Sequence, residues 1–110
     1  MTANLTVMTS EDAGALRVAA KGDLDLATVD RLGHALEDAE RRASGSSVVL
    51  DLSGLAFMDS TGLQILLDAD VRAATAGHAL AVVPGDGEAR RVLEIAGALS
   101  LLSVTEVRPG

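Results

Sequence analysis

Two hydroxyl side chains stand together in Asp59-Ser60-Thr61-Gly62, directly before an amphipathic stretch that predicts a helix. The first turn of a helix has free N–H groups, and its dipole favours negative charge. Thr61 and Gln64 fit a capping box, in which the two side chains cap the helix reciprocally. Two interpretations follow: the hydroxyls only cap the helix, or one of them accepts a phosphate. A phosphate adds about −1.5 to −2 charges where the dipole tolerates them.

Other motifs that would support catalysis do not occur in the sequence. It has no Cys, its only Lys is Lys21, and it contains neither a glycine-rich phosphate loop nor a Gly-x-Ser-x-Gly motif. His34 and His78 lie far apart, so no pair of histidines has the spacing of metal ligands. We therefore expect the protein to have no metal or cofactor of its own, and an enzyme is disfavoured, although the composition alone leaves a Ser–His–Asp triad open.

The charge balance limits the class of partner. The 9 basic and 16 acidic residues give a net charge of −7, which disfavours contact with nucleic acid or anionic lipid and favours a partner with basic side chains. Aromatic residues make up 1%, too few for stacking on single-stranded nucleic acid. No apolar run reaches transmembrane length and no signal peptide is visible, so a cytoplasmic protein is expected.

Apolar segments and turn residues predict the elements that must position the hydroxyls. With 110 residues and 48% apolar content, residues 1–110 form one domain. Strands are expected at 5–8, 15–20, 48–52, 80–83 and 104–107, and helices at 26–42, 63–76 and 88–96. This order predicts an α/β fold with a central mixed sheet of four to five strands and three to four helices, packed mainly on one side.

The central strand and the second helix carry further expectations. The nearly continuous apolar run Val48–Leu52 is typical of a strand covered on both faces. Asp70 falls into the apolar stripe of the second helix, whereas Ile65 points away from it and is a candidate partner contact. Gly33 inside the first helix has no explanation from the sequence. The expected buried stripe consists of Leu63, Leu66, Leu67, Val71 and Ala74.

The segments around the hydroxyls resemble the STAS domain of anti-sigma factor antagonists. The resemblance rests on Gly22-Asp23-Leu24-Asp25 and on Val48 to Leu63, above all on Phe57-Met58-Asp59-Ser60-Thr61-Gly62-Leu63. It covers nearly the whole chain and implies a single STAS-like domain that regulates transcription. In this family the dephosphorylated protein binds an anti-sigma factor, which is also a serine kinase, and the sigma factor is released.

The resemblance also implies roles for individual residues. The kinase phosphorylates the Ser after the Asp, here Ser60, with Thr61 as the fallback acceptor, and binding is then lost. A PP2C-type phosphatase restores binding, and ATP and magnesium belong to the kinase. Replacing Asp25 by Ala is expected to impair phosphorylation or binding with little loss of stability. The implied partner surface comprises Asp23, Asp25, Asp59, Ser60, Thr61, Gly62 and Ile65.

A second function stays open beside this switch. The chain can instead be a non-phosphorylated STAS subunit of a transport system, either a lipid-transport ATPase or an anion transporter. The intact Asp59-Ser60-Thr61-Gly62 motif favours the anti-sigma factor antagonist.

Overall fold

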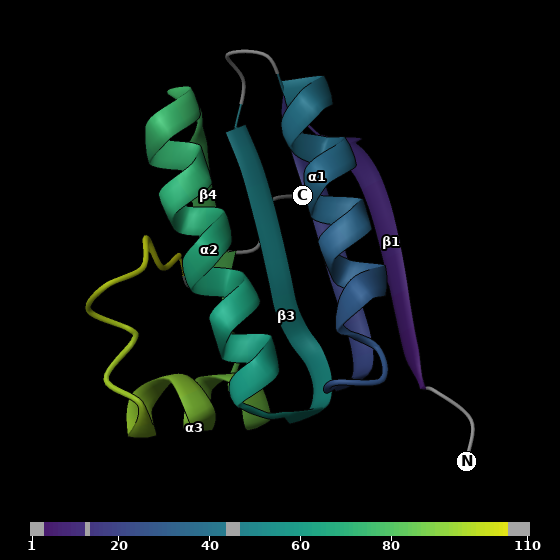
Figure 1. Ribbon diagram of the computed structural model, residues 1–110, viewed down its shortest axis with the longest axis vertical. Coiled ribbons are helices and arrows are strands. Elements are labelled where there is room, and N and C mark those ends of the chain that lie inside the picture. The colour runs from purple at the N-terminus through teal and green to yellow at the C-terminus, as the bar shows by residue number, and fades with distance from the viewer. Residues whose placement is uncertain (1–3, 13, 44–46, 106–110) are drawn as a thin grey trace.

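The chain forms an initial hairpin, after which helices and strands alternate (Figure 1). The computed structural model describes residues 4–12, 14–43 and 47–105. The strands are β1 (Leu5–Asp12), β2 (Ala15–Leu24), β3 (Ser47–Met58) and β4 (Ala79–Val83). The helices are α1 (Val29–Ala43), α2 (Ser60–Ala76) and α3 (Glu88–Ile95). None of the helices in these ranges combines the length and the apolarity that crossing a membrane requires.

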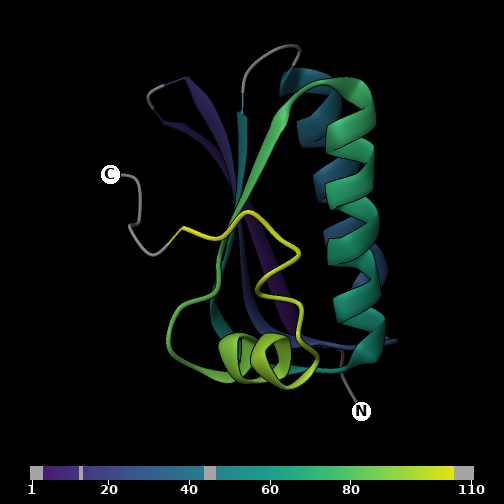
Figure 2. The same ribbon diagram turned by 90° about the vertical axis from the view of Figure 1, so that its left-hand side faces the viewer.

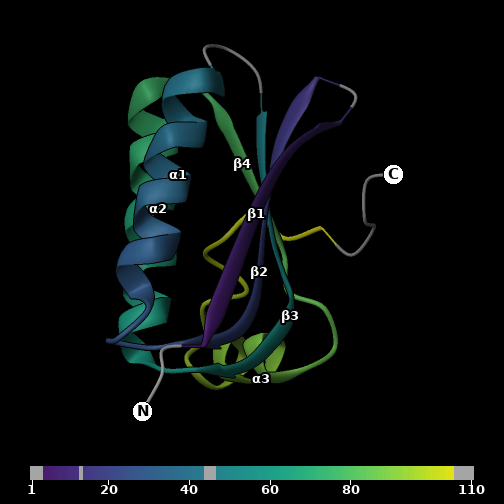
Figure 3. The same ribbon diagram turned by 90° about the vertical axis from the view of Figure 1, so that its right-hand side faces the viewer.

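The four strands form one mixed sheet in the order β1-β2-β3-β4. β1 and β2 are antiparallel, whereas β2, β3 and β4 are parallel, so α1 and α2 connect parallel neighbours. Right-handed crossovers place consecutive connecting helices on the same face of such a sheet. Figures 2 and 3 show α1 and α2 side by side on one face, with α3 at the end of the sheet where β3 ends. The predicted fold class is thereby confirmed.

The strand expected at 104–107 is reduced to a single bridge. Val104 pairs with Val82 of β4 in parallel orientation. The Val82 amide donates to the Ser103 carbonyl oxygen at 2.8 Å, and the Thr105 amide donates to the Val82 carbonyl oxygen at 2.8 Å. Residues 106 and 107 lie outside the described residues. The sheet that the structure describes therefore has four strands.

The hydrophobic core lies between the sheet and the two long helices. Alternate residues of the central strands face the helices and are buried, because side chains alternate between the two faces of a strand. α1 meets them with an apolar stripe at helical spacing. The core residues of these elements are Leu16, Val18 and Ala20 on β2, Val48, Leu50 and Leu52 on β3, and Leu32, Leu36 and Ala39 on α1.

The expectation that β3 is covered by elements on both faces is wrong for the part of the chain that the structure describes. α1 and α2 cover only one face of the sheet (Figure 3). The opposite face of β3 carries Val49, Asp51 and Ser53. Val49 is nonetheless buried, because it stands between Arg17 on β2 and Ala81 on β4. An uninterrupted apolar run therefore reflects burial by neighbouring strands as well as by helices.

A buried carboxylate organises this second face. Asp51 forms an ion pair with Arg17, and it accepts hydrogen bonds from the Ser53 hydroxyl at 2.6 Å and the Ser53 amide at 2.9 Å. Burial raises the pKa of Asp51, but the two bonds from Ser53 and the guanidinium of Arg17 outweigh it and hold the pKa below its usual value. The carboxylate is thus charged and satisfied in the folded protein.

We predict that Asp51 makes the stability of the protein sensitive to acid. Since its pKa is lower in the folded than in the unfolded chain, its contribution is complete well above the unfolded pKa of about 3.9 and is lost as the pH falls through the folded pKa. Asp51→Asn should lower the free energy of unfolding by about 1–3 kcal/mol at pH 7. Urea unfolding at several pH values checks this: the difference from wild type should shrink below about pH 4. A difference that does not change with pH would contradict the assignment.

Candidate functional site

Ser60 lies where the end of β3 passes into α2, at the end of the sheet next to α3 (Figure 1). It is the first residue of α2 and is exposed. Its hydroxyl makes no hydrogen bond to any residue that the structure describes. Thr61 is half-buried. Of the two candidate acceptors, Ser60 is therefore the more accessible one, and its hydroxyl is free to react.

Asp59, not Thr61, caps α2. Asp59 has extended backbone angles, φ −112° and ψ −173°, and its carboxylate accepts from the amides of Thr61 at 3.0 Å and Gly62 at 3.2 Å. The predicted capping box is wrong: the Gln64 amide donates to Asp68 at 2.9 Å, one turn further along the helix. Asp is among the strongest capping residues. Because it stands before both hydroxyls, the helix begins at Ser60.

The end of β2 lies directly beside this helix start. Asp23 pairs with Phe57 and Leu24 with Met58, and the Asp59 amide donates to the Leu24 carbonyl oxygen at 3.2 Å. Two shifts of register between β2 and β3 lengthen this pairing past residue 22, so β2 ends four residues later than predicted. Gly22 permits one shift: its φ is +106°, and a Cβ there would collide with the Asn4 carbonyl oxygen.

Asp25 caps α1. Its carboxylate accepts from the Ala27 amide at 3.0 Å, and its own amide donates to the Thr28 hydroxyl at 3.0 Å. The buried Thr28 hydroxyl donates to the Asp23 carbonyl oxygen at 2.7 Å. These bonds fold residues 25–28 into a turn, which is why α1 begins at Val29 and not at Leu26. The Asp25 carboxylate is half-buried, so it supports the helix and faces the site at once.

Two residues of the expected partner surface serve the packing of α2 instead. Gly62 is buried, and a Cβ there would lie 2.8 Å from side-chain atoms of Leu24. Ile65 does not point away from the protein as expected: it packs against the core, and a Cβ at Gly33 of α1 would lie 3.1 Å from its Cδ1. Gly33 thus lets α1 and α2 approach each other. This packing accounts for Ile65, whose contact with a partner stays a prediction.

The buried stripe of α2 also differs from the expected one. The fully buried residues are Gly62, Leu66, Ala69 and Ala73, whereas Val71 is 65% exposed and Ala74 is exposed. Asp70 is half-buried at the side of the helix that faces β4. Apolar residues occur around most of α2, so their spacing does not define one face. Asp70 is therefore not enclosed in the core, although the sequence pattern places it in the apolar stripe.

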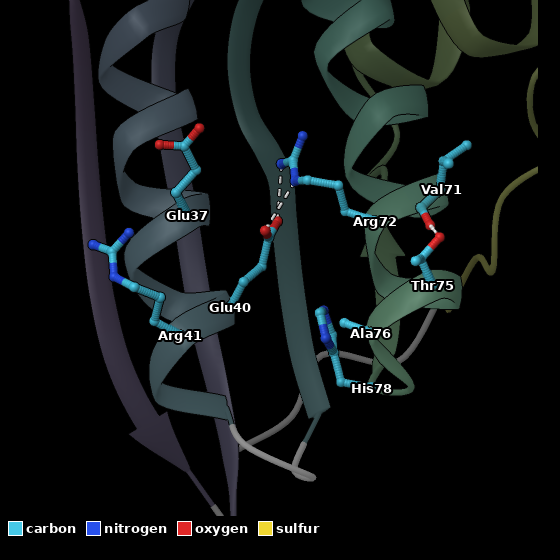
Figure 4. Close-up of a pocket in the computed structure, with 8 residues that line it drawn as sticks. All are labelled: Glu37, Glu40, Arg41, Val71, Arg72, Thr75, Ala76 and His78. Carbon is cyan, nitrogen blue, oxygen red and sulfur yellow. Dashed lines mark hydrogen bonds and ion pairs between the residues drawn. The ribbon is translucent and has the colours of Figure 1, made fainter.

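A groove lies between α1 and α2, toward the C-terminal ends of these helices (Figure 4). Its volume is about 490 Å³, and the paired side chains of Glu40 and Arg72 span it with two hydrogen bonds of 2.9 Å. The pair raises the pKa of Arg72. His78 lines the same groove. None of the residues expected at the partner surface lines this groove.

The structure shows two apolar residues at the site that the sequence did not single out. Leu26, in the turn before α1, is 78% exposed, and Phe57, near the end of β3, is 44% exposed. Both residues are neighbours of acidic residues of the site. Leu26 follows Asp25 in the sequence, and Phe57 pairs with Asp23 across the two strands. A large apolar residue in a short acidic turn is the signal from which they could have been recognised.

Comparisons with known proteins agree with this geometry. Residues 7–103 match the family model described as "Mlab, STAS domain". The chain therefore belongs to the STAS domain family. It is 29% identical over 101 residues to the anti-sigma F factor antagonist of Paenibacillus polymyxa, a match that covers 92% of this chain and 86% of the relative.

Solved structures show the same fold. An anti-sigma factor antagonist from Mycobacterium paratuberculosis superposes with a TM-score of 0.80 at 24% identity, covering 94% of this chain and 87% of the other. The anti-sigma factor antagonist SpoIIAA in its unphosphorylated form gives 0.75 at 15% identity, with 94% and 89% covered. The Bacillus cell fate determinant SpoIIAA in its phosphorylated form gives 0.70 at 14% identity, with 94% and 92% covered. At these identities the likeness supports the fold alone.

We predict that Asp25→Ala destabilises the protein, contrary to the expectation from the sequence. The variant loses the bond to the Ala27 amide in the turn that leads into α1, and loss of a comparable side-chain bond to free amides at a helix start costs about 0.5–2 kcal/mol. Asp23→Ala is the matched control, because only the backbone of Asp23 takes part in the hydrogen bonds of the turn. Thermal unfolding checks this: the melting temperature should fall by several degrees in Asp25→Ala and stay nearly unchanged in Asp23→Ala. Equal melting temperatures would contradict the capping role.

Proposed function

We propose that the protein is an anti-sigma factor antagonist controlled by phosphorylation of Ser60. Its dephosphorylated form binds an anti-sigma factor that is also a serine kinase, and the sigma factor is released. The kinase then transfers a phosphoryl group to Ser60, the complex dissociates, and a PP2C-type phosphatase returns the protein to its binding form. This cycle takes place in the cytoplasm.

The observation that carries the proposal is the free, exposed hydroxyl of Ser60 on a rigid helix start. In the transfer, the Ser60 oxygen bonds to the γ-phosphorus of ATP, the bond to ADP breaks, and the hydroxyl proton passes to a base of the kinase. ATP, magnesium and that base all belong to the kinase. This chain needs no cofactor, only an acceptor held in place by Asp59.

The cap at Asp59 explains why a phosphate would change the surface so strongly. The amides of Thr61 and Gly62, which would otherwise bind a phosphate, already donate to the Asp59 carboxylate. The charge of a phosphate on Ser60 would therefore not be offset by these amides. The phosphate would follow Asp59 directly in the sequence and lie at the end of the sheet that also carries Asp23 and Asp25. Added charge of about −1.5 to −2 at an interface weakens binding to a closely packed partner surface while the fold stays intact.

The second candidate is a STAS subunit of a transport system, such as a lipid-transport ATPase. One observation keeps it under consideration: the description of the matching family model names Mlab and not an anti-sigma factor antagonist. The match to the P. polymyxa antagonist and the free Ser60 hydroxyl favour the first candidate.

We predict that Ser60→Ala folds normally and binds the kinase whether or not ATP is present. Phosphorylated wild type should bind about 100-fold more weakly than the dephosphorylated protein, because the phosphate adds charge at the interface. Thr61→Ala is the matched control and should still be phosphorylated and released. Calorimetric titration of each protein with the purified serine-kinase anti-sigma factor, together with mass spectrometry, checks this.

Two results would count against this switch. If phosphorylated wild type and Ser60→Ala bind with equal affinity, phosphate at Ser60 does not control binding, and the transport subunit becomes the better explanation. If mass spectrometry finds the phosphate on Thr61 in wild type and none in Thr61→Ala, the acceptor is Thr61.

A further inference from the structure

We infer that Leu26 and Phe57 are the apolar anchors with which the protein holds its partner, and that the partner presents an apolar pocket bordered by basic side chains. This inference rests on the proposed function, since the anchors lie on the two segments that meet beside the proposed acceptor Ser60. It adds to that function which side chains supply the affinity of the dephosphorylated state.

The exposure of both residues is maintained by the fold. Leu26 is 78% exposed although the turn that carries it is fixed by the Asp25 carboxylate and the buried Thr28 hydroxyl. Phe57 is 44% exposed and is the one aromatic residue of the sequence. A rigid element that presents a large apolar side chain to water loses little conformational freedom on binding, and this is typical of anchor residues in interfaces.

The two anchors stand on the segments that the structure joins at Ser60. Phe57 pairs with Asp23 on β2, and the hydrogen bond from the Asp59 amide to the Leu24 carbonyl oxygen ties the two segments together. Leu26 follows Leu24 by two residues, and Ser60 follows Phe57 by three. The other large exposed apolar side chains lie on β1, in the second half of α2, at the end of α3 and in the C-terminal segment; they are Met8, Val71, Ile95 and Leu101.

Charge identifies the occupant of this surface. Residues 23–30 and 56–61 contain four Asp and no Lys, Arg or His. The nearby Arg31 donates to the Leu5 carbonyl oxygen at 2.9 Å and is thus turned toward β1. Apolar residues among carboxylates suit a protein surface with an apolar pocket and a basic rim. Phosphates of a membrane or a nucleic acid would be repelled, so we commit to the anti-sigma factor kinase as the occupant.

This arrangement divides the work of binding between two kinds of residue. Burial of the anchors slows dissociation, whereas the surrounding carboxylates speed association in a way that salt suppresses. A phosphate on Ser60 would lie three residues beyond Phe57, where β3 passes into α2. The anchors themselves carry no switch, so their loss should weaken binding without abolishing the effect of phosphorylation.

The test compares four serine substitutions in the full chain. Leu26→Ser and Phe57→Ser should each raise the Kd for the purified serine-kinase anti-sigma factor about 10- to 30-fold, mainly through faster dissociation. Val71→Ser and Met8→Ser are matched controls, because these side chains are 65% and 66% exposed in the second half of α2 and on β1, away from the segments that meet at Ser60, and should change the Kd less than about twofold. Surface plasmon resonance at two salt concentrations measures both rates.

The outcomes separate this inference from the function on which it rests. Leu26→Met should keep most of the affinity, since it preserves the apolar volume of the side chain. A loss of affinity in Leu26→Ser but not in Leu26→Met then reflects the lost apolar contact and not the change of residue itself. If Leu26→Ser and Phe57→Ser bind like wild type while phosphorylation of Ser60 still releases the kinase, the anchors are wrong and the switch stands. If wild type neither binds nor is phosphorylated by such a kinase, the proposed function fails and the anchors fail with it.

Discussion

The hydrogen bond from the Asp59 amide to the Leu24 carbonyl oxygen joins the end of β2 to the start of α2, and the site exists only because these two ends meet. The pairing of Asp23 with Phe57 and Leu24 with Met58 extends the sheet to this point. It extends that far because Gly22 adopts φ +106°, a conformation that side-chain-bearing residues rarely take. The acceptor, the acidic turn and the two exposed apolar residues are thereby held on one rigid edge.

Two carboxylates complete this edge, and each has a structural task. Asp25 stabilises the turn before α1 and Asp59 caps α2, and the two long helices begin at the same end of the sheet. Because both residues are acidic, the side chains that fix the helix starts also give the surface its negative potential. A substitution at either position changes stability and charge together. The contributions to binding are therefore better read from residues such as Leu26, whose side chain is free of the hydrogen-bond network.

The sequence allowed the fold class to be predicted, since strand and helix periods alternate clearly. The motif from Asp59 to Gly62 also predicted that Ser60 lies at a helix start, which the structure shows. The buried face of α2 was not predictable, because apolar residues surround the helix and tertiary packing, such as that of Gly62 on Leu24 and of Ile65 beside Gly33, selects the face. Local pattern also favoured Thr61 as the cap. Asp59 took that role because its backbone is held extended by Leu24, a partner 35 residues away in the sequence. Tertiary contacts of this kind leave no local signature.

The occupied cap bears on how such a domain can act as a switch. A phosphate at a helix start is usually stabilised by free backbone amides, which donate hydrogen bonds to it and offset part of its charge. Such bonds would favour a movement of the helix toward the phosphate. Here Asp59 already satisfies the amides of Thr61 and Gly62, so α2 gains nothing by moving toward the phosphate. The buried contact of Gly62 with Leu24 also leaves no room for such a movement. If Ser60 is phosphorylated as proposed, the modification would therefore change the charge of the surface and not its shape.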